Sequence, residues 1–168
     1  MEFHSHDWQA LATTMVGGGL IAGLVMGVIL QAGNGIIATI GSVSGSSSML
    51  IGWIVHLLLS VVFAAGFLVV LASKPIEVAF DTPTDTLLLG LIYGALLGSV
   101  TWGFVIPVSV GFESAFPLDF SPKATSVARF SIVLGLGHLT YGLVLSAIVI
   151  YRHRPMPLFA DEEDGIEG

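Results

Sequence analysis

Apolar residues fill four long stretches of the chain, and short polar or proline-containing segments separate them. The stretches are Leu11–Leu30, Met49–Ala72, Asp85–Val108 and Ala128–Tyr151. Each has about the 20 residues that a helix needs to cross roughly 30 Å of hydrocarbon. The pattern therefore predicts an all-α protein, a bundle of four transmembrane helices.

Glycines recur at corresponding places in the first and third stretches. The two sets, each with a spacing of four, are Gly19, Gly23 and Gly27 and, 71 positions later, Gly90, Gly94 and Gly98. This spacing places each set on one face of its helix. Small residues at such a face let helix backbones approach closely in lipid. We interpret both glycine stripes as helix-packing faces.

The second and fourth stretches each carry one histidine, His56 and His138, at an offset of 82. An aromatic residue lies three positions from each histidine and a small residue lies four positions after it. These neighbours are Trp53 and Ser60 in the first copy and Tyr141 and Gly142 in the second. The chain is thus expected to be two helical-hairpin repeats, parallel and related by an axis along the membrane normal.

An ionisable side chain inside a membrane is a functional hypothesis by default. One interpretation is structural, with each histidine hydrogen-bonding across a helix interface over a glycine stripe. A second is haem b held by His56 and His138, with Arg129 contacting a propionate. A third is a proton relay or ligand contact. Zinc is not expected, because it takes three or four protein ligands.

The spans divide the chain into five segments. They are a polar head (1–10), a first hairpin (11–72), a connection (73–84), a second hairpin (85–151) and an acidic tail (152–168). Thr84 is a candidate N-cap for the third span. Residues 31–48 are uncharged and rich in glycine and serine, which predicts an interfacial loop, a frayed helical extension or a re-entrant segment whose backbone protein or water would satisfy.

Composition narrows the function classes. Only 10% of the residues are charged, against about 25% in soluble domains. The absence of cysteine excludes disulfides, thiolate nucleophiles and iron–sulfur clusters. No basic patch is present, so we expect no nucleic-acid partner. A net charge of −7 favours a halophilic source as a hypothesis.

The basic residues indicate how the chain is oriented in the membrane. Lys74, Arg152 and Arg154 lie on the side of the termini, against Lys123 and Arg129 on the other side. This asymmetry predicts cytoplasmic termini in a multi-pass protein of the plasma membrane.

Several motifs resemble a family of small four-span membrane proteins of haloarchaea and bacteria, similar in style to the YagU inner-membrane proteins. The motifs are Gly52-Trp53-Ile54-Val55-His56, Gly90-Leu91-Ile92-Tyr93-Gly94, Trp102 with Pro107, and Gly137-His138-Leu139-Thr140-Tyr141-Gly142. The resemblance covers about residues 15–150 and implies the four-span fold. It implies no biochemical activity.

No Ser-His-Asp order, phosphate loop or pair of intramembrane carboxylates is present in the sequence, so hydrolase and kinase functions lack residues to carry them. The expected function is therefore that of a non-enzymatic accessory or structural subunit. Its partners would be the lipid bilayer and either other membrane subunits or further copies of itself. The alternatives are a bis-histidine haem b electron carrier and a small transporter or channel with its site at the repeat interface.

Overall fold

The computed structural model describes residues 7–42, 44–46, 48–73, 75–76, 82–105 and 123–153. Four of its helices are long and apolar enough to cross a membrane: Gln9–Asn34, Met49–Leu71, Pro83–Val105 and Val127–Arg152. These bounds agree with the four predicted stretches to within a few residues. The prediction of an all-α, four-span bundle is confirmed for the part of the chain that the structure describes.

Two of the four spans contain a wider, π-helical turn. The first span consists of α1 (Asp7–Thr13), the π-helical η1 (Thr14–Gly18) and α2 (Gly19–Asn34). After α3 (Ile37–Ser42), the second span is α4 (Met49–Leu71). The third span is α6 (Pro83–Val100) followed by the π-helical η2 (Thr101–Val105), and the fourth is α9 (Lys123–His153).

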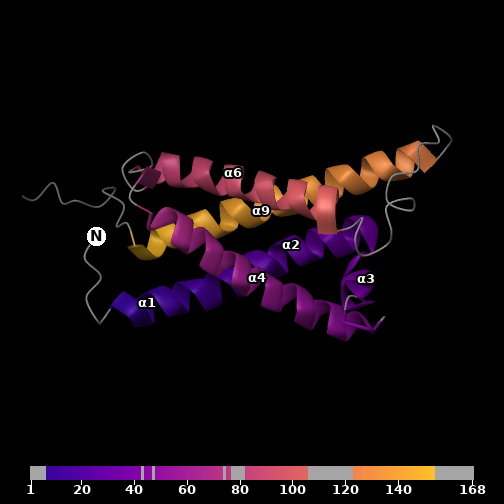
Figure 1. Cartoon of the computed structure of the whole chain (residues 1–168), viewed down its shortest axis with the longest axis horizontal. Helices are drawn as coiled ribbons and strands as arrows, with labels where there is room; N and C mark the ends of the chain where they lie inside the picture. Colours follow the sequence, from indigo (N-terminus) through magenta and orange to yellow (C-terminus); the bar gives the residue numbers. More distant parts are fainter. Residues whose placement is uncertain are drawn as a thin grey trace, which may run out of the picture.

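Successive spans run in opposite directions, so α4 and α9 point the same way (Figure 1). α2 packs against both α4 and α9, and α6 packs against α9. Buried apolar side chains between the helices form one core, which includes Ala22, Met26, Leu30, Phe67, Tyr141 and Leu145. Large apolar side chains on the outside remain exposed, among them Leu24, Leu58, Leu96 and Leu136. An apolar outer surface is what a bundle in lipid requires.

The start of α6 differs from the prediction. Thr82, not Thr84, is the N-cap: its hydroxyl oxygen accepts from the Asp85 backbone N–H at 3.1 Å, and the Asp85 carboxylate accepts from the Thr82 backbone N–H. Pro83 then occupies the first helical turn, where its missing N–H is not needed. Because the N-cap residue precedes Pro83, the prediction of Thr84 as the N-cap is wrong.

The predicted interfacial loop contains a separate packed helix. α2 ends at Asn34 and is capped by Gly35, whose φ of 64° is accessible to glycine at little cost. α3 follows and packs on the start of α4. Ile37 is fully buried, and a Cβ atom on Gly52 would collide with its carbonyl group. The segment is therefore neither a simple loop nor a frayed continuation of α2.

Some predicted segments cannot be compared. Most of the polar head, the residues from 106 to 122 and the acidic tail from 154 onward lie outside the described residues.

Candidate functional site

His56 joins the two helices of the first hairpin. Its side chain is 4% exposed, and its Nε2 lies 2.9 Å from the carbonyl oxygen of Gly23 on α2. Because a carbonyl only accepts, Nε2 carries the proton in this bond. The Trp53 ring meets the imidazole edge-on, with centroids 5.9 Å apart. His56 thus donates its Nε2 proton to a backbone carbonyl of the glycine stripe.

His138 occupies the corresponding place in the second hairpin but has different partners. It is 3% exposed. Its Nδ1 donates to the Leu134 carbonyl at 2.8 Å, and Nε2 lies 3.2 Å from the Thr101 hydroxyl oxygen. A neutral imidazole with a protonated Nδ1 accepts at Nε2, so the Thr101 hydroxyl donates. The two neutral histidines are therefore opposite tautomers.

Both glycine stripes lie against the histidine-bearing helix of their own hairpin. A Cβ atom on Gly27 would lie 3.0 Å from His56 Cδ2, and one on Gly98 would lie 3.3 Å from His138 Cβ. At Gly94 the carbonyl carbon of His138 would be 3.0 Å away. The stripes thus occupy close helix contacts at matching positions. The internal repeat itself stays a prediction, which these matched contacts support.

Two tyrosines of the second hairpin attach it to α4. Tyr141 on α9 donates to the Ser60 carbonyl at 2.5 Å, and Tyr93 on α6 donates to the Phe63 carbonyl at 2.7 Å. The sequence pattern predicted Tyr141 as a neighbour of His138 and indicated no function for Tyr93. Ser60 in turn donates its hydroxyl to the His56 carbonyl at 2.8 Å. The middle of α4 is therefore a junction where the two hairpins meet.

Arg129 lies at the carbonyl end of α2. Its Nη2 donates to the Gly33 carbonyl oxygen at 2.8 Å, and Asn34 donates to the Phe130 carbonyl nearby at 3.2 Å. A cation at a helix C-terminus is favoured by the unpaired carbonyls and the helix dipole. This contact gives Arg129 a structural partner within the protein, and its contact with a haem propionate stays a prediction.

The described arrangement is not a ready haem site. A bis-histidine haem needs one open ring nitrogen on each imidazole, directed toward a shared space. Here His56 Nε2 and both nitrogens of His138 are hydrogen-bonded within the protein, the first to α2 and the others to η2 and to α9 itself. Haem ligation through Nε2 of His56 or through either nitrogen of His138 would have to displace such a bond. The haem hypothesis stays a prediction for spectroscopy.

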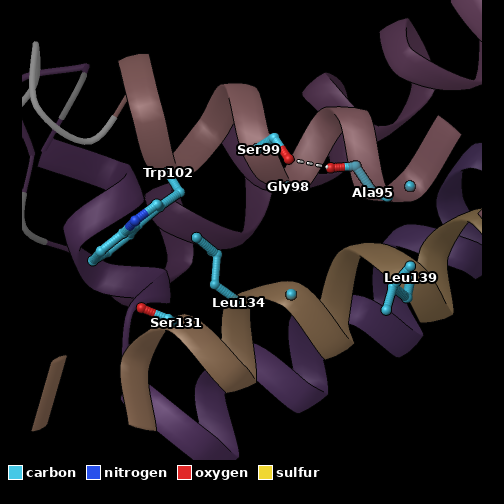
Figure 2. A pocket seen from close by; sticks show the side chains of 9 residues that line it. Ala95, Gly98, Ser99, Trp102, Ser131, Leu134 and Leu139 are labelled. Carbon is cyan, nitrogen blue, oxygen red and sulfur yellow. Dashed lines mark hydrogen bonds between the residues drawn. The ribbon is translucent and has the colours of Figure 1, made fainter. Parts of the chain in front are cut away.

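A groove of about 280 Å³ lies between α6 and α9 (Figure 2). Its lining residues are Gly94, Ala95, Gly98, Ser99, Trp102, Ser131, Leu134, Gly135 and Leu139. Both serine hydroxyls donate to carbonyls of their own helix, at 2.8 Å for Ser99 and 2.9 Å for Ser131. They can still accept a hydrogen bond. No periodicity in the sequence indicated this groove.

Within the described ranges, no group of three or more histidine, cysteine, aspartate or glutamate side chains comes together that could hold a metal ion. Comparison with protein-family models, curated proteins and solved structures finds no match. The resemblance to the YagU-like proteins therefore stays a prediction.

Proposed function

We propose that the chain is a non-enzymatic integral membrane protein of the plasma membrane, with cytoplasmic termini, that serves as an accessory or structural subunit of a larger membrane complex. The observation that carries this proposal is the use of both intramembrane histidines as buried hydrogen-bonding groups. Each ties its helix to the neighbouring helix of its own hairpin. A side chain used in this way supports the bundle rather than a reaction.

Satisfied polar groups support the same proposal. Among the described residues, no buried side-chain nitrogen or oxygen lacks a hydrogen-bond partner. A reactive or transported species is usually met by polar groups held ready for it. Here the buried serines bond to carbonyls of their own helices, and the buried tyrosine Tyr141 bonds to α4. The interior is organised for packing, and the remaining apolar surface faces lipid or other helices.

The test begins with a dithionite-reduced minus oxidised visible spectrum of protein purified from cells grown with adequate iron and haem. We expect a flat spectrum, and we expect His56→Ala to lower stability without any optical change. A b-type band that disappears in both His56→Ala and His138→Ala would replace the proposal with haem electron transfer. Proton or ion flux into proteoliposomes above protein-free controls would replace it with transport.

A further inference from the structure

The two buried histidines differ in what their second ring nitrogen receives. In the second hairpin both nitrogens of His138 have partners, because Nδ1 donates to Leu134 and Nε2 receives the Thr101 hydroxyl. In the first hairpin Nε2 of His56 donates to Gly23, and Nδ1 has no hydrogen-bond partner among the described residues. A neutral imidazole that is protonated at Nε2 accepts at Nδ1. His56 therefore retains one unpaired acceptor.

The residue that matches Thr101 in the first hairpin cannot serve as a donor. Thr101 lies 71 positions after Leu30, and 71 is also the offset between the two glycine stripes. Leu30 is 1% exposed, and its side chain lies against Gly137. Because leucine has no hydroxyl group, the hydrogen bond that completes His138 has no counterpart at His56.

The ring of His56 also directs Nδ1 away from α2. A Cβ atom on Gly27 would lie 3.0 Å from Cδ2 of His56, and Nε2, the next ring atom, bonds to Gly23. The edge formed by Cδ2 and Nε2 therefore faces α2, and Nδ1 lies on the other edge. One turn along α4, the hydroxyls of Ser60 and Tyr141 both donate to carbonyl oxygens. These hydroxyl protons are thus not available to Nδ1.

A small molecule can reach Nδ1 even though the side chain of His56 is only 4% exposed. Every completely buried side-chain nitrogen or oxygen of the described residues has a hydrogen-bond partner. Because Nδ1 has no partner, it is not completely buried. A polar atom without a partner in an apolar interior is costly, and a small donor at this point would remove that cost.

We propose that Nδ1 of His56 is a water-binding site, at which a water molecule donates the hydrogen bond that the Thr101 hydroxyl provides in the second hairpin. Bound water that completes buried polar groups is a regular part of protein interiors. His56 lies seven residues after Met49, the first residue of α4, which is roughly 10 Å at 1.5 Å per residue. The other hydrogen bonds of this water go to further waters toward that end of α4. The inference goes beyond the proposed structural function, because it assigns a ligand to one histidine and none to the other.

The test is nitrogen NMR of the full chain in hydrated phosphatidylcholine bilayers, with isotope-labelled imidazole nitrogens. His4→Gln, His6→Gln and His153→Gln remove the other three histidines, and the opposite tautomers of His56 and His138 assign the remaining signals. We expect Nδ1 of His56 to show the shift of a hydrogen-bonded acceptor and to receive magnetisation from water protons. Nε2 of His138 should show the shift without the transfer from water. A His56 Nδ1 signal at the position of a free acceptor, or one without transfer from water, would overturn the proposal.

Thr101→Val is the control for this measurement. It removes the donor from His138 and should move the Nε2 signal of that residue, while the Nδ1 signal of His56 stays in place. A moved His138 signal shows that the shift reports a missing donor.

Radiolytic footprinting of the unsubstituted chain in the same bilayers gives a second readout. Hydroxyl radicals that form from bound water oxidise the side chains beside it, and mass spectrometry locates the oxidised residues. His56 and His138 are buried to the same extent, at 4% and 3% exposed. We expect more oxidation at His56 than at His138, and equal oxidation at the two would contradict the water site.

The outcomes distinguish this inference from the proposed function. If Nδ1 of His56 receives no magnetisation from water and the visible spectrum is flat, the water site is wrong and the structural function stands. A b-type band or ion flux would overturn the function, whereas the nitrogen signal of His56 decides the water site.

Discussion

The two hairpins use the same pair of elements, a glycine stripe against a histidine, in different ways. In the first, His56 reaches across to the Gly23 carbonyl, and Trp53 closes the space beside it. In the second, His138 turns its Nδ1 to its own helix at Leu134 and receives the Thr101 hydroxyl at Nε2. One hairpin is closed by its own side chains, whereas the other retains a groove. Matching sequence positions thus set the helix contacts but not the chemistry around them.

Glycine-to-alanine substitution in the two stripes should give the largest difference in unfolding free energy between the two hairpins. Gly94→Ala would place a methyl group 3.0 Å from the His138 carbonyl carbon and 3.2 Å from Leu139 Cα. Because backbone atoms cannot rotate away, α6 and α9 must separate, at a cost of about 3 kcal/mol or more in the free energy of unfolding. At Gly27 the nearest atoms belong to the rings of Trp53 and His56, which lie far from their backbone, so Gly27→Ala should cost about 1 to 2 kcal/mol.

The measurement is reversible unfolding in detergent mixtures. Gly135→Ala is the control, because a Cβ atom there meets nothing within 4 Å, and alanine is favoured over glycine inside a helix by about 0.5 to 1 kcal/mol. Equal destabilisation by Gly94→Ala and Gly27→Ala would show that the two positions pack alike and that the contrast between them is wrong.

The histidines should give the next largest effect. His56→Ala removes the bond to α2 and the contact with Trp53, which should lower the free energy of unfolding by about 2 kcal/mol. For His138 the informative comparison is a double-mutant cycle with Thr101→Val. We expect a coupling energy of about 0.6 kcal/mol, the average for hydrogen bonds between membrane helices. A coupling energy of zero would show that the hydrogen bond between Thr101 and His138 does not stabilise the protein.

Nitrogen NMR of the labelled protein in lipid checks the same contrast without mutation. His56 should show a protonated Nε2 and His138 a protonated Nδ1, because the first bonds to a carbonyl through Nε2 and the second through Nδ1. His56→Ala and His138→Ala assign the two signals. Identical tautomers at both positions would contradict the different hydrogen bonding of the two hairpins.

The sequence predicted the spans and the packing stripes because these depend on local properties. Length and apolarity define a span, and spacing by four defines the face that holds Gly19 or Gly90. The groove at Gly135, the Thr101 partner of His138 and the docking of Ile37 on α4 depend on which helices become neighbours. In a chain that is apolar around every helix, the periodicity that marks a buried face in water is weak. Those contacts therefore could not be predicted from the sequence and become visible only in the folded structure.

The tyrosines should contribute less than the histidines. Tyr141→Phe keeps the buried ring and removes only the hydroxyl that donates to Ser60, so it should cost about 1 kcal/mol of unfolding free energy. Tyr93→Phe should cost less, because its bond to Phe63 is only partly buried. Because both tyrosines donate to carbonyls of α4, we expect the double variant Tyr141→Phe/Tyr93→Phe to loosen the attachment of the second hairpin to α4. Hydrogen exchange in α4 is the readout, and Tyr151→Phe, at an 82% exposed position, is the control. If exchange rises equally in α2 and α4, the loss is global and the tyrosines do not act at this junction.

Arg129 should have the smallest effect and the clearest dependence on salt. Its guanidinium donates to Gly33 from an exposed position at the end of α2, where a charge near a helix terminus contributes about 0.3 to 1 kcal/mol. Arg129→Gln should therefore lower the free energy of unfolding by less than about 1 kcal/mol. The difference should shrink as salt rises, because exposed charges are screened. Arg152→Gln removes the same charge from an exposed position near the other end of α9 and is the matched control. A larger loss that persists in high salt would show that Arg129 binds something more than the carbonyl end of α2, and would return attention to an anionic ligand.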